Sequence, residues 1–220
     1  MRRQGGQRRN LDDDAPPVIV SPKKALAIGD SNAVWEFYDR GFKCIQQTAC
    51  KEMGKALIKI IAPKKQANNP YTKGDATAPD WWPRPWGPGE KDRVRHVEPD
   101  HLWKKGLSLL LDPPPGTLEI VSDKRPERVH LLKHILRLII EPATQPLSMH
   151  KLEGLTVAKM EAAAFESLAA WFGDKKKPEN AMKRPILKEI FKVAKMEERY
   201  KRHEIGMSPL WSRVREACSY

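Results

Sequence analysis

Residues 28–32 read Ile-Gly-Asp-Ser-Asn, a run that a serine esterase could use to carry its nucleophile. That chemistry also requires oxyanion-hole donors and an Asp-His pair later in the chain. The sequence after residue 32 contains no segment that supplies these parts. Asp, Ser and Asn are also residues preferred at helix N-caps. We therefore interpret this run as the start of a helix and not as a catalytic site.

A second candidate for chemistry is the pair His130 and His134, which lie four residues apart and would share one face of a helix. This spacing can hold a metal ion, but the residues between them lack the Glu of the zinc-protease motif. No Cys and His cluster supplies the remaining ligands of a tetrahedral site, and no glycine-rich phosphate loop occurs. We expect no metal, no cofactor and no enzymatic activity.

Basic side chains are better organised on the segment 128–140. His130, Lys133, His134 and Arg137 recur at helical spacing. The opposite side carries an apolar stripe typical of a core-facing side, formed by Val129, Leu132, Leu136 and Ile139. The segment contains no acidic residue before Glu141, so repulsion between its cations is uncompensated within the helix. We predict that Lys133 and Arg137 enter a groove of duplex DNA, flanked by the two histidines. The alternative is an ordinary solvated helix face.

Further cations alternate with tryptophans between residues 73 and 96. We expect the cations to position the DNA backbone and the tryptophans to support an ordered loop by packing on the helices. The cations are Lys73, Arg84, Arg93 and Arg95, and the tryptophans are Trp81, Trp82 and Trp86.

Two short basic clusters lie near the C-terminal end, Lys175-Lys176-Lys177 and Lys183-Arg184. Their spacing suits nuclear import, although short basic clusters also arise by chance. We predict that the protein is nuclear.

The apolar periodicity predicts an all-α protein, a compact helical bundle with a long ordered loop rich in Trp and Pro. One amphipathic helix of about eight turns is expected from the cap at 29–32 to Pro63. Residues 64–100 contain six prolines and form the loop. Further helices are expected at 101–111, 126–140, 156–172 and 185–203, with at most a short strand at 118–121.

These elements divide the chain into three parts. Residues 1–25 form a disordered tail, 26–172 the helical-bundle domain, and 173–220 a basic helical extension and tail. Of the 220 residues, 40 are Lys or Arg and 28 are Asp or Glu, giving a net charge of +12. This charge favours an acidic partner, with nucleic acid ahead of an anionic membrane surface.

Other classes of protein are disfavoured. The mean hydropathy of −0.62 and the shortness of the apolar runs argue against a membrane protein, and the first residues lack the apolar core of a secretory signal. Three cysteines are too few for a disulfide framework, which favours a reducing intracellular compartment.

Two blocks of sequence resemble a family of fungal helical-bundle proteins that includes the subtelomeric hrmA-associated cluster proteins. They are Pro70–Pro83, which contains Trp-Trp-Pro, and Arg95–Leu102. Phe42–Gln47 and Pro63–Gln66 belong to the same resemblance, which extends over about residues 25–172 and implies a helical bundle.

The same segments are more distantly similar to the DNA-binding domain of plant ethylene-insensitive-three-like transcription factors. The shared order is Lys73-Gly74, Trp81-Trp82-Pro83, Pro99–Leu102 and the basic segment 128–140. Residues 103–125 depart from the plant pattern as an insertion, and its second Trp pair is missing. This similarity implies an all-α fold that binds duplex DNA.

We therefore predict a nuclear DNA-binding protein that acts in transcriptional regulation and reads duplex DNA with a basic helix. The alternative is a helical protein-interaction module that does not bind nucleic acid.

Overall fold

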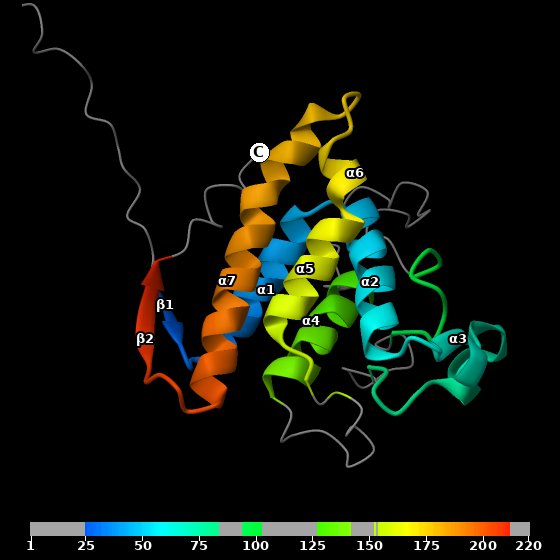
Figure 1. The fold of residues 1–220 in the computed structure, drawn as a ribbon, viewed down its shortest axis with the longest axis horizontal. Coiled ribbons are helices and arrows are strands. Elements are labelled where there is room, and N and C mark those ends of the chain that lie inside the picture. The colour runs from blue at the N-terminus through cyan, green and yellow to red at the C-terminus, as the bar shows by residue number, and fades with distance from the viewer. Residues whose placement is uncertain (1–24, 84–93, 103–126, 142–151, 153, 212–220) are drawn as a thin grey trace, which may run out of the picture.

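The computed structural model describes residues 25–83, 94–102, 127–141, 152 and 154–211 of the 220-residue chain. Five helices form a bundle, as expected for an all-α protein (Figure 1). They are α1 (Ser31–Cys44), α2 (Gln47–Ile61), α4 (Glu127–Ile140), α5 (Val157–Ser167) and α7 (Arg184–Lys201). Shorter helical turns are α3 (Lys65–Asn68), η1 (Tyr71–Thr77), α6 (Ala169–Phe172) and η5 (Pro178–Lys183).

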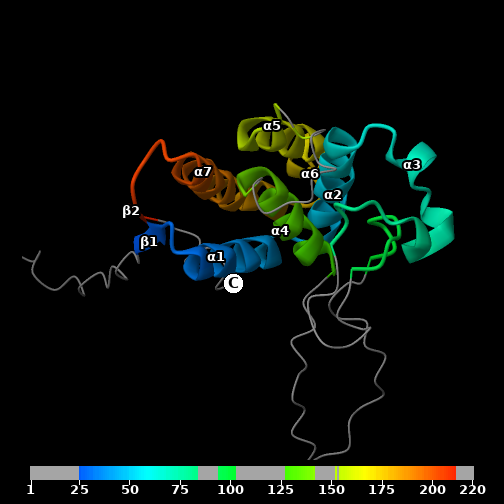
Figure 2. The ribbon, with the colours of Figure 1, turned by 90° about the horizontal axis from the view of Figure 1, so that it is seen from below.

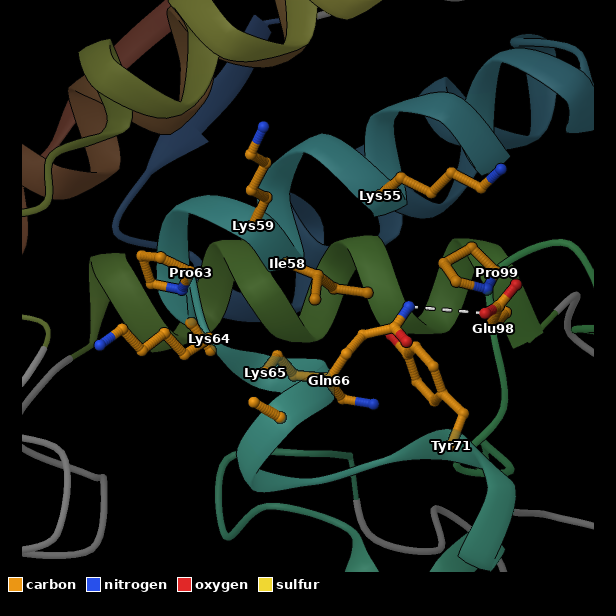
Figure 3. A pocket seen from close by; sticks show the side chains of 12 residues that line it. Lys55, Ile58, Lys59, Pro63, Lys64, Lys65, Gln66, Tyr71, Glu98 and Pro99 are labelled. Carbon is orange, nitrogen blue, oxygen red and sulfur yellow. Dashed lines mark hydrogen bonds between the residues drawn. The ribbon is translucent and has the colours of Figure 1, made fainter.

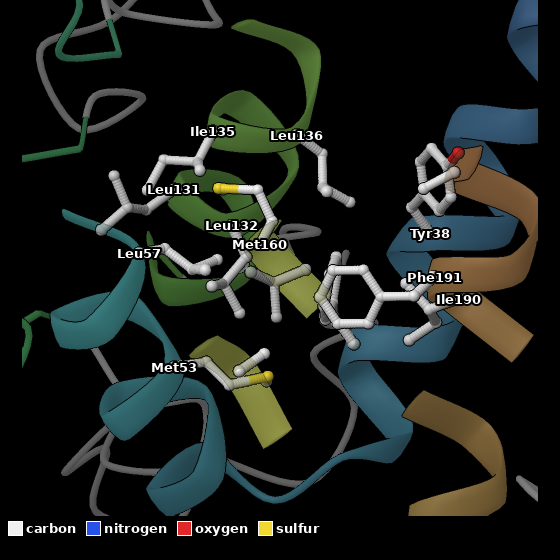
Figure 4. Packing of buried hydrophobic residues seen from close by; sticks show 14 of the residues in the cluster. Tyr38, Met53, Leu57, Leu131, Leu132, Ile135, Leu136, Met160, Ile190 and Phe191 are labelled. Atoms are coloured by element: carbon white, nitrogen blue, oxygen red, sulfur yellow. The ribbon is translucent and has the colours of Figure 1, made fainter. Parts of the chain in front are cut away.

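Helix α4 is the central element, with α1, α2, α5 and α7 packed around it (Figure 2). Its apolar residues are buried on every side, including Leu131, Ile135 and Leu138, which lie outside the predicted stripe. Figure 4 shows Leu131 and Leu132 facing α2 and α5, while Leu136 faces the side of α1 and α7. The expected division of this helix into one packed face and one solvated basic face is therefore wrong.

The single long helix expected before Pro63 is in fact two helices. Ile45 and Gln46 adopt extended backbone angles, with ψ of 132° and 147°, and separate α1 from α2. The break lets α1 pack on α4 and α7 while α2 packs on α4 and α5. Ile45 is itself buried at the turn. Packing against other helices fixes this turn. It could not be predicted from the sequence, because the apolar periodicity continues through it without interruption.

Several predicted helix ends are confirmed. The Asp30 side chain accepts a hydrogen bond from the Ala33 N–H at 3.1 Å, which caps α1. Thr156 does the same for the Lys159 N–H at 3.3 Å and caps α5. The helix expected to reach residue 172 is interrupted at Leu168, where α5 ends and α6 follows. The helix expected at 101–111 lies almost wholly outside the described residues.

Helix α7 belongs to the core, so the bundle continues beyond residue 172, where we expected the compact domain to end. Ile186, Leu187, Ile190 and Phe191 are buried against α1, α4 and α5. Gly41 permits the close approach of α1, because a Cβ there would lie 2.8 Å from the Ile190 side chain.

Two short strands were not predicted. Strand β1 (Ala25–Ile28) pairs antiparallel with β2 (Ser208–Trp211), so the segment before α1 lies beside the segment after α7. Residues 1–24 of the expected disordered tail lie outside the described residues. No helix in the described ranges is long and apolar enough to cross a bilayer.

The tryptophan loop is described only in part. Trp81 and Trp82 are buried, and the Trp82 indole donates a hydrogen bond to the Val94 carbonyl at 3.1 Å. These two side chains thus pack into the protein as expected. Residues 84–93, which include Trp86, fall outside the described part.

Candidate functional site

Lys133 and His134, two of the basic residues predicted on α4, contact acidic and carbonyl groups from distant parts of the chain. Lys133 Nζ lies 2.9 Å from Asp39 Oδ1 on α1, and the two side chains are only 13% and 15% exposed. Lys43 also contacts Asp39, at 2.7 Å. Although burial favours the neutral acid, hydrogen bonds from Lys43 and Lys133 lower the pKa of Asp39. Lys133 therefore stabilises the contact between α4 and α1 and does not point into solvent.

The neighbouring basic residues follow the same pattern. His134 Nε2 lies 2.7 Å from the Trp81 carbonyl oxygen, and burial lowers the pKa of this imidazole. Arg137 is exposed, but its Nε donates to Glu141 at 2.9 Å and its guanidinium lies over the Trp35 ring. His130 is half-buried. The four side chains do not form a free cationic surface.

The cations expected to position the DNA backbone differ in their contacts. Arg95 forms two hydrogen bonds with the Glu127 carboxylate, at 3.0 and 2.7 Å, and a third with the His101 carbonyl. Lys73 is exposed and has no ion pair within the described residues. Arg84 and Arg93 lie outside those residues.

Arg128 has a structural role that sequence reasoning missed. This side chain is 2% exposed and donates to three carbonyl oxygens, of Pro99 at 2.8 Å, Asp100 at 3.0 Å and Gln47 at 3.3 Å. It therefore ties residues 99–100, at the end of the tryptophan loop, to the start of α2. An Arg at the beginning of a helix carries no local sign of such distant partners.

Among the described residues, a group of six cations without ion pairs lies elsewhere, at the turn from α6 through η5 into α7. We call it the basic tip. Its members are exposed or half-exposed, and none forms an ion pair within the described residues. They are Lys175, Lys176, Lys177, Lys183, Arg184 and Lys188. Five of these six were predicted for nuclear import, and the fold brings them together at one end of the bundle (Figure 1).

The basic tip is anchored to the bundle. The Asn180 side chain is fully buried and donates to the Trp171 carbonyl at 3.0 Å, which holds η5 against α6. The Arg184 guanidinium lies 5.7 Å from the ring centres of Phe165 and Phe172. This turn therefore presents its lysines from a fixed backbone.

A groove of about 670 Å³ lies between α2, α3 and residues 98–99 (Figure 3). Lys55 and Lys59 project from α2 on one side, Tyr71 closes the opposite side, and Ile58 lies between them. We call it the lysine-rimmed groove. Its lining residues are Lys55, Ile58, Lys59, Ala62, Pro63, Lys64, Lys65, Gln66, Ala67, Tyr71, Glu98 and Pro99.

Lys65 is the unusual residue of this groove. It is 4% exposed, and its Nζ has no hydrogen-bond partner among the described residues. The amine lies over the Tyr71 ring and 5.4 Å from the centre of a Trp82 ring. Burial lowers the pKa of Lys65 to about 7, against the opposing effect of Glu98, and burial raises the pKa of Tyr71 to about 12. The burial of Lys65 was not predicted from the sequence, which indicated only that Lys65 belongs to the segment Pro63–Gln66.

The structure offers no metal centre within its described residues, because no three His, Cys, Asp or Glu side chains there are grouped suitably. His96 is fully buried, and its Nδ1 lies 2.7 Å from the Gly74 carbonyl oxygen.

Comparison with known proteins identifies the family. A family model described as "YDR124W-like, helical bundle domain" matches residues 22–112 and 121–214, which include every described helix. A subtelomeric hrmA-associated cluster protein of Aspergillus fumigatus is 31% identical over 214 residues, covering 88% of this chain and 33% of the relative. The chain thus spans about a third of that relative's length. No solved structure matches. The chain therefore belongs to the YDR124W-like helical bundle family.

Proposed function

We propose that this domain binds duplex DNA through the basic tip and not through α4. The observation that carries the proposal is the concentration of six cations, without ion pairs among the described residues, at the turn before α7. Lysines at such a surface can approach several phosphates at once and release the counterions that surround DNA. The net charge of +12 adds a long-range attraction to the same polyanion.

The chemistry of the basic tip indicates which part of DNA it contacts. Five of its six cations are lysines, whose ammonium groups act as point charges without the planar geometry that arginine offers to bases. Phosphate contacts of this kind position a protein on DNA but carry no sequence information. The proposed binding is therefore largely independent of sequence. A role in transcriptional regulation remains part of the proposal on the resemblance to the plant DNA-binding domain alone.

The test compares two variants with the same loss of charge. In the first, four lysines of the basic tip are changed to Gln, namely Lys175, Lys176, Lys177 and Lys183. In the control, four exposed lysines elsewhere are changed to Gln, namely Lys59, Lys64, Lys159 and Lys192. Binding to a fluorescein-labelled duplex is measured by anisotropy. We expect the tip variant to lose about tenfold or more in affinity and the control to lose much less. Equal losses would show that only net charge matters.

The same residues lead us to propose a nuclear location. If the basic tip is also an import signal, changing its two clusters to Ala should shift a large fluorescent fusion from the nucleus to the cytoplasm. A bulky fusion is needed because a 25.1 kDa chain is small enough to enter passively. Unchanged nuclear accumulation would reject this role without affecting the DNA proposal.

A further inference from the structure

We propose that the lysine-rimmed groove binds an organic anion with an apolar body, such as a medium-chain fatty carboxylate, and that Lys65 receives its acid group. This site shares no residue with the basic tip, so it stands or falls separately from DNA binding.

The size and lining of the groove suit a small amphipathic molecule. Its volume of about 670 Å³ lies within the range of ligand sites in proteins, which is about 300–1,000 Å³. Ile58, Pro63, Tyr71 and Pro99 give it apolar walls on several sides (Figure 3). An alkyl chain or a flat ring placed there would remove these surfaces from water.

Lys65 supplies the second and independent observation. Its amine is buried and has no hydrogen-bond acceptor in the part of the chain that the structure describes. It lies instead over the ring of Tyr71, which is itself a wall of the groove. A buried donor without a partner is unfavourable, and a ligand oxygen within reach would satisfy it. A neutral apolar guest could not do so.

The charges around the groove favour an anion over a cation. Lys59 and Lys64 are exposed at its edge and form no ion pair within the described chain. Lys55 is already paired with Asp100 at 2.8 Å. The acidic member of the lining, Glu98, accepts a hydrogen bond from Gln66 at 3.5 Å.

Binding of the anion should also change the protonation of Lys65. The titratable groups that face it are Glu98 and His96, near the end of the tryptophan loop, and Tyr71 on η1. Because burial lowers the pKa of Lys65 to about 7, a large share of this amine is neutral in the free protein above that pH. A bound carboxylate stabilises the ammonium form, so the complex takes up a proton. Affinity should then fall by up to about tenfold for each pH unit above 7.

The experiment uses the full chain and isothermal titration calorimetry with decanoate, below its micelle concentration. Decanol tests the apolar part of the ligand alone, and inorganic phosphate tests the anionic part alone. Repeating the decanoate titration in buffers of different ionisation enthalpy measures the proton uptake. We expect saturable decanoate binding, at least about tenfold weaker binding of decanol, and no saturable binding of phosphate.

Two substitutions at Lys65 separate charge from packing. Lys65→Met keeps an unbranched side chain and should weaken decanoate binding by about tenfold or more and abolish proton uptake. Lys65→Arg keeps the charge at all accessible pH values and should retain binding without its pH dependence. Lys192→Met, on the surface of α7, is the control and should behave as the unmodified protein. Circular dichroism melts show that each variant is folded.

Several results would overturn the proposal. Equal affinity for decanoate and decanol would mean an apolar cleft that does not recognise charge. Decanoate binding that is unchanged in Lys65→Met would remove Lys65 from the site. Absence of decanoate binding to the unmodified protein would reject the groove as a site for this class of ligand.

Discussion

Lys133 on α4 donates a hydrogen bond to Asp39 on α1, with 2.9 Å between Nζ and Oδ1 and both side chains largely shielded from solvent. The two residues are 94 positions apart in the sequence. Their contact fastens the central helix to α1. It also removes from solvent the lysine that looked best placed to enter a DNA groove.

This contact predicts an effect on stability. Lys133→Ala should lower the free energy of unfolding by about 1–3 kcal/mol, because it leaves a shielded carboxylate with one of its two lysine partners. Arg137→Ala, on the exposed part of the same helix, should change it by less than about 0.5 kcal/mol. Urea denaturation measures both. If Lys133→Ala were as stable as the unmodified protein, Lys133 would not be a structural residue.

A larger loss is expected at Arg128. Its guanidinium satisfies three carbonyl oxygens in a buried setting, and no other residue type reproduces that fork. Arg128→Met should cost about 3 kcal/mol or more. Arg128→Lys should recover only part of this, because one ammonium group does not match the guanidinium geometry. A fully stable methionine variant in urea denaturation would contradict the role of Arg128 as a clamp.

Glu197 predicts a dependence of stability on pH. Its carboxylate is 2% exposed and accepts a hydrogen bond from the Gly29 N–H at 2.6 Å. Burial raises the pKa of Glu197 above 4.5, opposed by that hydrogen bond and by Lys201, while Glu141 and Asp30 add to the increase. The folded state therefore holds the Glu197 proton more tightly than the unfolded state. The contribution of Glu197 is fully present below pH 4.5 and is lost as pH rises through the raised pKa.

The substitution Glu197→Gln isolates this effect, because Gln keeps an oxygen that can accept from Gly29 but carries no charge. The stability of the variant relative to the unmodified protein should rise as the pH increases above 4.5. Urea unfolding at a series of pH values gives the difference at each point, with all other titrating groups shared. A difference independent of pH would show that Glu197 does not titrate abnormally.

Trp82 offers a test of the described part of the tryptophan loop. The side chain is 2% exposed and its indole N–H is paired with the Val94 carbonyl. Trp82→Ala should therefore lower the free energy of unfolding by about 3–5 kcal/mol. Trp82→Phe should lower it by less, because the phenyl ring keeps most of the apolar contact. Thermal unfolding distinguishes them. An unchanged midpoint for Trp82→Ala would mean that this loop adds nothing to the core.

Local features of the sequence predicted much of the fold. Asp30 and Thr156 cap helices as their residue types suggest, and the periodic segment 128–140 is helical almost to the residue. The split at Ile45–Gln46 was missed, because the apolar periodicity continues through it and only packing against α4, α5 and α7 reveals the turn.

The candidate site was harder to predict for the same physical reason. A row of cations on one helix carries no information about Asp39, which comes from a distant part of the chain. The burial of Lys65 could not be predicted from its neighbours in the sequence, because it depends on Tyr71 and Trp82. Five of the six cations of the basic tip were singled out, for nuclear import, because their grouping is already local in sequence.

The most direct test of DNA binding by the basic tip is the salt dependence of affinity for a duplex. For the unmodified protein, log K should fall linearly with log salt concentration. In the variant that carries Gln at Lys175, Lys176, Lys177 and Lys183, the slope should be smaller by about 0.9 for each lost phosphate contact. The variant with four lysines changed elsewhere should keep the original slope. If the unmodified protein shows no salt-sensitive binding to any duplex, the DNA proposal is wrong and an interaction module without nucleic acid takes its place.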